Sequence, residues 1–385
     1  MLINDYKFID EEIDYITKVR RELHMIPEVG LDLPKTMAYV KNILDGLKVK
    51  YITCATSGFL VILDGINNEE AIAFRADMDG LSIKEENDVP YKSQTNNAHA
   101  CGHDGHMAIL LTILKLIHNK PLKKRVILVF QPGEESPGGA NIILKETDFI
   151  KKYNVTSIFG LHLSPMIEHG KLGLYCGKFM AGVKAFDLIV TGKEAHGAMP
   201  HQGIDSIVAA SYLITSVQSI VSRNADPREP SVITFSSING GSYNSVIADK
   251  VTLRGQIRAF QNDVLDMLVE KLENHIKGLQ YSFSVEAKLN ISELSYPPTY
   301  NDDELFNTIK TNLDEQDYEI IQPLPWSEDF AFYAMETRGL FVNLGIKKKK
   351  SYANPLHSSK FNYNENSLLY GVKYFYRVLQ INSIL

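Results

Sequence analysis

The sequence predicts an α/β protein whose main domain is built on a mostly parallel β-sheet. Three features indicate this fold class: short apolar runs, helical segments between these runs, and a change of pattern in the middle of the chain. Strands that are buried on both faces, as in parallel sheets, are continuously apolar rather than alternating. With 385 residues the chain exceeds the usual size of a single hydrophobic core, so we expect two domains.

Three apolar runs in the first half of the chain are predicted to be buried strands, at residues 71–76 (AIAFRA), 126–130 (VILVF) and 157–161 (SIFGL). An apolar helix is expected between the first two, at residues 107–118. Polar residues follow each run directly, and His162 follows the last one. Because sites in open α/β sheets form at the carboxyl ends of the strands, we expect these polar side chains to converge.

An inserted second domain is predicted over residues 180–292, and residues 1–179 with 293–385 are expected to form the first domain. The expected elements of the second domain are a strand at 184–191, a helix at 204–221, strands at 231–238 and 250–260, a helix at 264–276 and a strand at 282–289. This β-α-β-β-α-β order is that of the ferredoxin-like fold.

Composition and charge exclude several classes of protein. The chain has 40 Lys and Arg against 46 Asp and Glu, a formal charge of −6, which does not suit a nucleic-acid binder. Its three cysteines are too few for a disulfide framework and indicate a reducing compartment. The amino-terminal segment lacks the apolar core of a secretory signal, and the longest apolar run, 108–117, is shorter than the roughly 20 residues that span a bilayer. We therefore expect a cytoplasmic protein without a membrane partner.

The densest chemical signal is the run HACGHDGH at residues 99–106. Three imidazoles, a thiol and a carboxylate within eight residues are poorly explained by packing, because these groups lose hydration on burial. Thiolate and imidazole are suitable ligands for Zn²⁺ or a related divalent ion. Glu134 and Glu135 follow a buried strand, where adjacent carboxylates point in different directions, so one can bind metal while the other faces a water molecule. His162 and His357 are further candidate ligands.

Together, the motifs HACGHDGH, QPGEE, GLHL, GKEAHGAMPHQGID, SEDFAFY and PLHSS closely resemble the aminoacylase/carboxypeptidase family of metal-dependent amidohydrolases. The similar branch includes hippurate hydrolases, N-acetyl-diaminopimelate deacetylases and auxin-conjugate hydrolases. The resemblance runs from about Tyr15 to the carboxyl terminus. It implies a zinc-exopeptidase-like catalytic domain with two divalent metal ions per chain, and an inserted lid that also forms a homodimer. The thiol favours Zn²⁺, although Mn, Ni or Co could occupy the same ligands.

The resemblance also assigns the metal ligands. It implies that Cys101 is shared by both ions, that His103 and His162 complete one set, and that Glu135 and His357 complete the other. Where many relatives have His-x-Asp after the first strand, this chain has Asp77-Met78-Asp79. Asp77 or Asp79 therefore remains an alternative to His103. Five further residues are expected to orient the ligands without binding metal: His99, Asp104, His106, His201 and Asp329.

The remaining roles that the resemblance implies concern catalysis and substrate binding. Glu134 would be the general base, which takes a proton from the attacking water and passes it to the leaving amine. His196 in the lid would reach the reacting carbonyl, within its own subunit or from the partner. Asn244 and Arg258 would bind the substrate carboxylate or the oxyanion. The plainer interpretations are a surface histidine for His196 and a strand arginine paired with a surface carboxylate for Arg258.

We expect an enzyme that removes the acyl group from an N-acyl amino acid or a small peptide-like amide. The alternative within this class is an N-acetyl-diaminopimelate deacetylase. Two other classes remain open. A cysteine hydrolase with Cys101 as its nucleophile would leave the two glutamates and the distant histidines without a role. The complete set of ligands and the general base count against a binding protein without activity.

Overall fold

The computed structural model describes residues 6–347 and 354–385 and divides the chain into two compact units. The first unit comprises Met1–Gly177, Tyr300–Gln322 and Asp329–Leu385, and the second comprises Lys178–Thr299 and Pro323–Glu328. The second unit therefore extends past the expected boundary at residue 292 and includes a short later segment. Leu324 belongs to it because its backbone N–H donates to Phe179 and its carbonyl accepts from Ala181.

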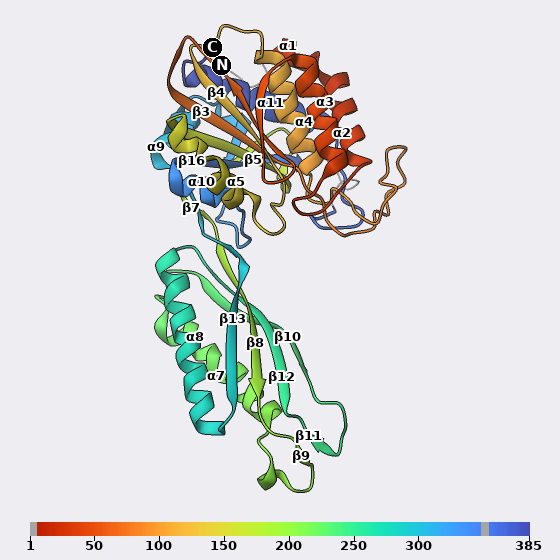
Figure 1. Ribbon diagram of the computed structural model, residues 1–385. Coiled ribbons are helices and arrows are strands. Elements are labelled where there is room, and N and C mark those ends of the chain that lie inside the picture. Colours follow the sequence, from red (N-terminus) through yellow and green to blue (C-terminus); the bar gives the residue numbers. More distant parts are fainter. Residues whose placement is uncertain (1–5, 348–353) are drawn as a thin grey trace. The chain divides into compact units, whose positions relative to one another are not determined.

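The first unit is built on an eight-stranded sheet, shown in Figure 1. Its strands lie in the order β1 (Lys50–Cys54), β2 (Gly58–Leu63), β4 (Lys124–Gln131), β3 (Asn67–Asp77), β5 (Val155–Glu168), β16 (Arg338–Lys347), β6 (Leu172–Leu174) and β15 (Tyr318–Ile320). The four central strands β4, β3, β5 and β16 are parallel. This arrangement confirms the predicted α/β class, and it brings the carboxyl ends of the central strands to one edge.

Helices cover both faces of this sheet. One face packs against α2 (Ile13–His24), α3 (Pro34–Leu47), α4 (His103–Ile117), α9 (Asp303–Thr311) and α11 (Asn366–Ile381) in one continuous apolar core. The opposite side carries α5 (Gly139–Thr147), α6 (Phe149–Lys152) and α10 (Ala331–Glu336). Successive side chains of β3 point to opposite faces of the sheet. Phe74 contacts the rings of Phe159 and Phe375 in the apolar core, whereas Arg75 forms an ion pair with Asp329, which precedes α10.

The strand β5 is longer than its sequence suggests. We predict a strand that ends at Leu161, directly before His162, but β5 continues to Glu168. Its pairing with β3 stops at Gly160, whereas its pairing with β16 continues through His162 opposite Asn343. His162 therefore lies within a strand, at the point where one of its two neighbours ends.

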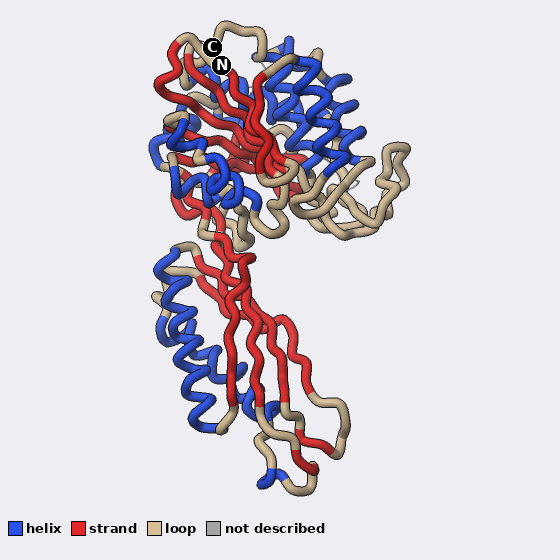
Figure 2. The backbone as a smooth tube through the Cα atoms, in the orientation of Figure 1, coloured by secondary structure: helices blue, strands red, loops and turns tan. Residues whose placement is uncertain are grey.

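The second unit has the predicted ferredoxin-like order of elements. Its antiparallel sheet has the order β10 (Ser231–Gly240), β12 (Lys250–Ala259), β8 (Gly182–Thr191) and β13 (Glu286–Tyr296). The helices α7 (Ser206–Asn224) and α8 (Asn262–Phe283) pack on one side of it (Figure 2). The strand predicted at 282–289 begins later because α8 continues to Phe283. Two small two-stranded sheets are also present: β9 (Ala195–His196) pairs with β11 (Val246–Ile247), and β7 (Gly177–Met180) pairs with β14 (Thr299–Asn301). In the first unit, a short helix, α1 (Lys7–Asp10), precedes α2.

Within the described ranges, the helices are all too short or too polar to cross a lipid bilayer.

Candidate metal centre

Cys101 lies at the meeting point of two groups of candidate ligands. Its Sγ atom is 3.3 Å from Nε2 of His162 and 3.3 Å from Nε2 of His357. One group consists of Cys101, His103 and His162, the other of Cys101, Glu135 and His357, and the ligand atoms of each group lie within 4.8 Å of one another. The structure thus brings together the five side chains that the resemblance assigns to metal binding, with the thiol common to both groups.

The backbone around Cys101 requires a glycine at the next position. Gly102 has φ of 91° and caps the amino terminus of α4, which lets the chain turn between Cys101 and His103. A Cβ atom at this position would lie 2.9 Å from a methyl carbon of Leu163, the neighbour of His162 on β5. On the other side, the N–H of His357 donates to the carbonyl of Ala100 at 2.9 Å. These contacts fix three distant segments around the thiol.

The rings of His103 and His162 are oriented as metal ligands. Nδ1 of His103 lies 2.8 Å from the backbone carbonyl of Asp79, and Nδ1 of His162 lies 2.8 Å from that of Leu163. A carbonyl only accepts, so each Nδ1 carries a proton and each Nε2 is the atom that would bind a metal ion. Nε2 of His103 is buried and has no hydrogen-bond partner among the described residues. A buried ring nitrogen without a hydrogen-bond partner fits the position of a ligand to a bound cation.

The charges around the thiol also suit a cation. Burial raises the pKa of Cys101 well above its usual value, and the carboxylates of Glu135, Glu134 and Asp77 raise it further. Burial lowers the pKa of His103, but the carboxylates of Asp77 and Asp79 outweigh this effect and raise it to about 10. A divalent ion would reverse both shifts, because it favours a thiolate and a neutral imidazole. A protonated, buried thiol is also a poor nucleophile, which disfavours the cysteine-hydrolase alternative.

Asp79, an alternative ligand to His103, accepts hydrogen bonds from the backbone with both of its carboxylate oxygens. One of its carboxylate oxygens accepts the backbone N–H of Glu134 at 3.0 Å, and the other accepts that of Glu135 at 3.1 Å. Its carboxylate therefore holds the turn that presents both glutamates. Burial raises the pKa of Asp79, and the nearby imidazole of His103 opposes the rise.

Asp77, the other alternative ligand, forms a further group of potential metal ligands with His103 and His106, so the alternative stays open. Its Oδ1 atom accepts from Nδ1 of His106 at 2.6 Å, and its Oδ2 atom accepts from Arg75 at 2.7 Å. Nε2 of His106 accepts the backbone N–H of Leu163, beside His162, and Arg75 also donates to Asp329. His106 and Asp329 therefore belong to a hydrogen-bonded chain that ends next to a candidate ligand. Asp104 enters a second hydrogen-bonded chain with Arg20, His24 and Glu85, three residues that are not among the predicted site residues.

The lid residues His196, Asn244 and Arg258 belong to the second unit, so their approach to the metal ligands stays a prediction. His196 is exposed on β9, and its Nδ1 accepts the N–H of Ala198 at 3.1 Å, which leaves Nε2 as the N–H position. Asn244 is exposed ahead of β11. Arg258 on β12 donates to the carbonyl of Pro325 and to Gln256. His201 lies in the second unit as well, on an exposed turn, so its expected role beside the ligands also stays a prediction.

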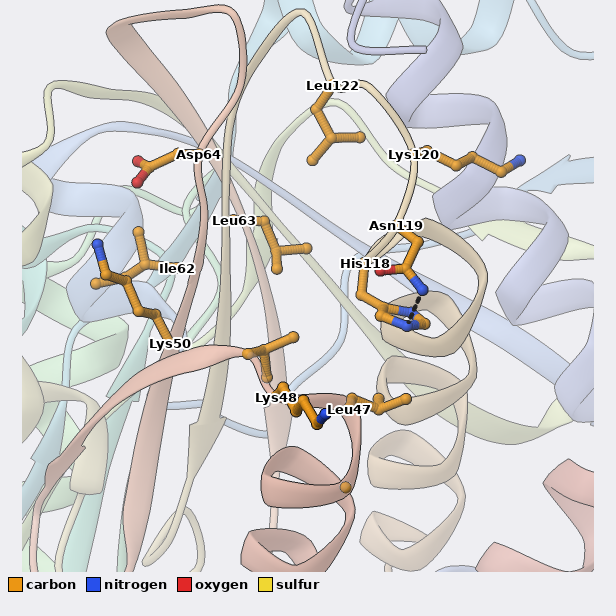
Figure 3. Close-up of a pocket in the computed structure, with 12 residues that line it drawn as sticks. Leu47, Lys48, Lys50, Ile62, Leu63, Asp64, His118, Asn119, Lys120 and Leu122 are labelled. Carbon is orange, nitrogen blue, oxygen red and sulfur yellow. Dashed lines mark hydrogen bonds between the residues drawn. The ribbon is translucent and has the colours of Figure 1, made fainter.

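A separate hollow in the first unit is shown in Figure 3. It lies between the end of α3, the strands β1 and β2, and the loop after α4, and Lys48, Lys50, Lys120 and His118 contribute to its lining. Both ring nitrogens of His118 are used, since Nδ1 donates to the carbonyl of Lys115 and Nε2 accepts from Asn119. In the part of the chain that the structure describes, none of the groups of potential metal ligands includes a residue of this hollow. The candidate centre is therefore the cluster around Cys101.

The sheet, the shared thiol and the paired glutamates define the class of metal-dependent hydrolases. Comparison with known sequences agrees, because the profile of Peptidase family M20/M25/M40 matches residues 73–381. The chain belongs to this family, and it is a metal-dependent amidohydrolase. This result confirms the resemblance seen in the motifs.

Three similar proteins illustrate the range of the family. The N-acetyldiaminopimelate deacetylase of Listeria monocytogenes serovar 1/2a is 34% identical over 360 residues, which cover 92% of this chain and 95% of the relative. The IAA-amino acid hydrolase ILR1-like 2 of Arabidopsis thaliana is 34% identical over 372 residues, 94% of this chain and 83% of the relative. A third similar protein is YXEP of Bacillus subtilis, a dinuclear metal-binding peptidase of the M20 family with a crystal structure. The two structures superimpose with a TM-score of 0.83 at 25% sequence identity, and the match covers 97% of this chain and 99% of the YXEP chain.

Proposed function

We propose that this protein hydrolyses the amide bond of small N-acyl amino acids with two divalent metal ions. The observation that carries the proposal is the position of Cys101 in both groups of candidate ligands. A ligand shared between two ions is what a dinuclear hydrolytic site requires, since such ions lie about 3.5–4 Å apart. The dinuclear B. subtilis structure supports the same conclusion.

In this proposal, His103 and His162 hold one ion, Glu135 and His357 hold the other, and Cys101 binds both. Zn²⁺ is favoured because the proposed ligand set includes the thiolate of Cys101, while Mn, Ni and Co ions are compatible with the same ligands. When bound, the ions would acidify a water molecule and polarise the amide carbonyl. The side chain of His357 is half exposed, so we expect substrate to approach from its side of the cluster.

Glu134 is proposed as the general base and then the general acid. A carboxylate oxygen of Glu134 lies within 4.8 Å of the ligand atoms of His103 and Glu135, and the residue is only 7% exposed. Asp79 fixes the backbone of Glu134, so the carboxylate can be held at a defined position while it moves a proton from the attacking water to the leaving amine. Such a group contributes about 10²–10⁴-fold to the rate.

The second unit is proposed to act as the lid. The exposed ring of His196 can donate from Nε2 to the oxyanion that forms at the reacting carbonyl, a contribution of about 2.7–4 kcal/mol. Asn244 and Arg258 are proposed to bind the substrate carboxylate or the oxyanion. The partners of Arg258 in the second unit are a carbonyl and an amide rather than a carboxylate, which leaves its charge available for an anion.

The leading substrate class is N-acyl amino acids in general, and N-acetyl-diaminopimelate is the second candidate. The second candidate is favoured by the name of the Listeria relative, whereas the Arabidopsis relative of equal identity is named for a different acyl group. The test is a panel of N-acetyl-diaminopimelate, N-acetyl, N-benzoyl and auxin-conjugated amino acids, assayed with each metal after chelation. Activity on none of these amides with any metal would overturn the proposal.

A homodimer formed through the lid is also proposed. On α7, Ile207, Val208 and Tyr212 are all at least 40% exposed, and β10 is an edge strand of the lid sheet. A second copy could cover this helix surface and continue the sheet at that edge. Sedimentation equilibrium of the wild type and of Val208→Glu tests this proposal, since the variant is expected to be monomeric and a monomeric wild type would contradict it.

A further inference from the structure

A buried cluster of charged side chains connects α2 to both halves of the candidate metal centre. Arg20 and His24 lie one turn apart on α2 and face Asp104 at the start of α4 and Glu85 in the loop after β3. None of the four residues is more than 3% exposed. Charged groups are almost never buried to this extent unless they are paired, so the arrangement needs a structural or functional reason.

The first arm of the cluster reaches His103. Asp104 follows His103 directly, and its Oδ1 atom accepts the backbone N–H of Gly105 at 2.9 Å. Its Oδ2 atom lies 2.9 Å from Nε of Arg20 and 2.7 Å from Nδ1 of His24. The two cations on α2 therefore fix the first turn of α4, which begins at His103, two residues after Cys101.

The second arm reaches the segment that carries His357. Nε2 of His24 lies 3.1 Å from Oε1 of Glu85, and the same oxygen accepts from Asn87 at 2.9 Å. Asn87 in turn donates to the carbonyl of Phe361 at 2.9 Å, four residues after His357. His24 is thus linked, through one carboxylate on each side, to both groups of candidate ligands.

Arg20 holds the same segment from another direction. Its Nη2 atom donates to the side-chain oxygen of Asn362 at 3.1 Å. The guanidinium carbon lies 4.6 Å from the ring centre of Tyr363, and the Nη1 atom lies 3.5 Å from a carboxylate oxygen of Glu365. The planar guanidinium with its several donors can serve these partners and Asp104 together, which an ammonium could not do.

The charges of the cluster balance. Ionised carboxylates only accept hydrogen bonds, so both nitrogens of His24 donate and the ring is an imidazolium. Burial and the nearby Arg20 lower the pKa of His24, but its bonds to Asp104 and Glu85 outweigh them and raise it above the ordinary value. The two cations therefore face the carboxylates of Asp104 and Glu85, and the further carboxylate of Glu365 is paired with Arg21 at 2.7 Å, which allows the cluster to stay buried.

We propose that Arg20 and His24 are positioning residues that keep the two ligand groups at the separation that a pair of ions requires. The cluster then sets the affinity for metal and does more than add stability to the fold. The inference rests on the proposed two-metal function, but its test measures ion binding and not turnover. Groups that orient metal ligands without touching the ion typically affect metal affinity or activity by about 10–100-fold.

The test uses the full chain with the substitution His24→Gln. The amide of Gln is neutral and donates from a single nitrogen, so it cannot replace the two charged N–H groups of His24 that face Asp104 and Glu85. Zn²⁺ affinity is measured by competition with a fluorescent chelator, and the thiolate absorption of the Co²⁺-loaded protein reports the geometry around Cys101. We expect the affinity for at least one of the two ions to fall about 10–100-fold and the Co²⁺ spectrum to change. Arg20→Lys, which keeps the charge but loses the planar fork, should show a smaller effect of the same kind.

Lys373→Met is the matched control. Lys373 on α11 is 3% exposed and pairs with Asp10 at 2.6 Å, so its loss also removes a buried cation from the first unit, but this pair has no contact with the candidate ligands. The control should lose unfolding free energy, measured in chelator, and keep its Zn²⁺ affinity and Co²⁺ spectrum. The inference is overturned if His24→Gln and Arg20→Lys bind metal as the wild type does, or if Lys373→Met loses the same affinity for an equal loss of stability. A wild type that binds two ions but hydrolyses no amide would overturn only the proposed function.

Discussion

Sγ of Cys101 and Nε2 of His357 lie 3.3 Å apart, although 256 positions separate the two residues in the chain. Two ligands of one tetrahedral Zn²⁺ ion lie about 3.6 Å apart, from a Zn–S distance of about 2.3 Å and a Zn–N distance of about 2.0–2.1 Å, so the observed distance is already close to ligand spacing. It depends on the backbone bond from His357 to Ala100 and on the left-handed conformation of His357, with φ of 62°. The predictions below follow from this shared thiol and from the groups around it.

Replacement of the shared thiol should affect both ions. In Cys101→Ala, we expect the metal content to fall from two ions per chain to one or none, because both ligand groups lose a member. Elemental analysis of the purified protein gives the stoichiometry. Cys54→Ala is the control, since Cys54 is a buried thiol on β1 outside both groups. Two tightly bound ions in Cys101→Ala would contradict the assignment.

Glu134→Gln should separate catalysis from metal binding. The amide cannot take up the proton of the attacking water, so kcat should fall by about 10²–10⁴-fold while both ions remain bound. The adjacent variant Glu135→Gln should instead lose metal, because Glu135 is in the group with His357. Steady-state kinetics and elemental analysis of the two variants test this contrast, and an active Glu134→Gln enzyme would rule out the proposed base.

His196→Ala should slow turnover without disturbing the fold. The side chain is exposed on β9, so its removal leaves no cavity, but the proposed oxyanion donor is lost and kcat should fall by about 10²–10³-fold. His201→Ala is the matched control, as an exposed histidine of the same unit. Equal kcat values for the two variants would show that His196 has no part in the reaction.

Removal of metal should abolish activity reversibly. Dialysis against a strong chelator should give an inactive protein that recovers on addition of Zn²⁺, Mn²⁺ or Co²⁺, because the proposed nucleophile is a water molecule. A cysteine hydrolase would be insensitive to the chelator. Full activity of a protein shown to be free of metal would therefore favour Cys101 as the nucleophile.

The charged cluster on α2 predicts a pH dependence of stability in the metal-free protein. The pKa of His24 is raised in the folded state, so the stability that it contributes is present below its unfolded pKa of about 6.5 and is lost as the pH rises through the folded pKa. The free energy of unfolding of the wild type, relative to that of His24→Gln, should therefore decrease as the pH increases above about 6.5. Urea titrations at a series of pH values measure the difference, and a difference independent of pH would show that the ring is neutral.

Much of the candidate site is visible in the sequence because its residues occur in short motifs. Cys101 and His103 lie in one run of eight residues, and Glu134 and Glu135 are adjacent after a continuous apolar strand. The fold class is visible for a similar reason, since buried strands and the ferredoxin-like order leave local patterns. These signals need no knowledge of distant partners.

Features set by distant partners are not visible in this way. The length of β5 beyond Leu161 depends on its pairing with β16, which lies far along the chain. His24 is 80 positions from Asp104 and 61 from Glu85, so its role cannot be read from its surroundings. One local signal was present, because Arg20 and His24 fall on the buried stripe of α2 with Ile16 and Leu23, where an unpaired charge would be costly.

The wide separation of Cys101 and His357 has a consequence for biosynthesis. During translation, the thiol leaves the ribosome long before the imidazole of His357. If the proposed ligand assignment holds, a nascent chain that lacks His357 has only one complete ligand group. A chain that ends before His357 is therefore expected to lack the proposed second metal site and, with it, the proposed hydrolytic activity.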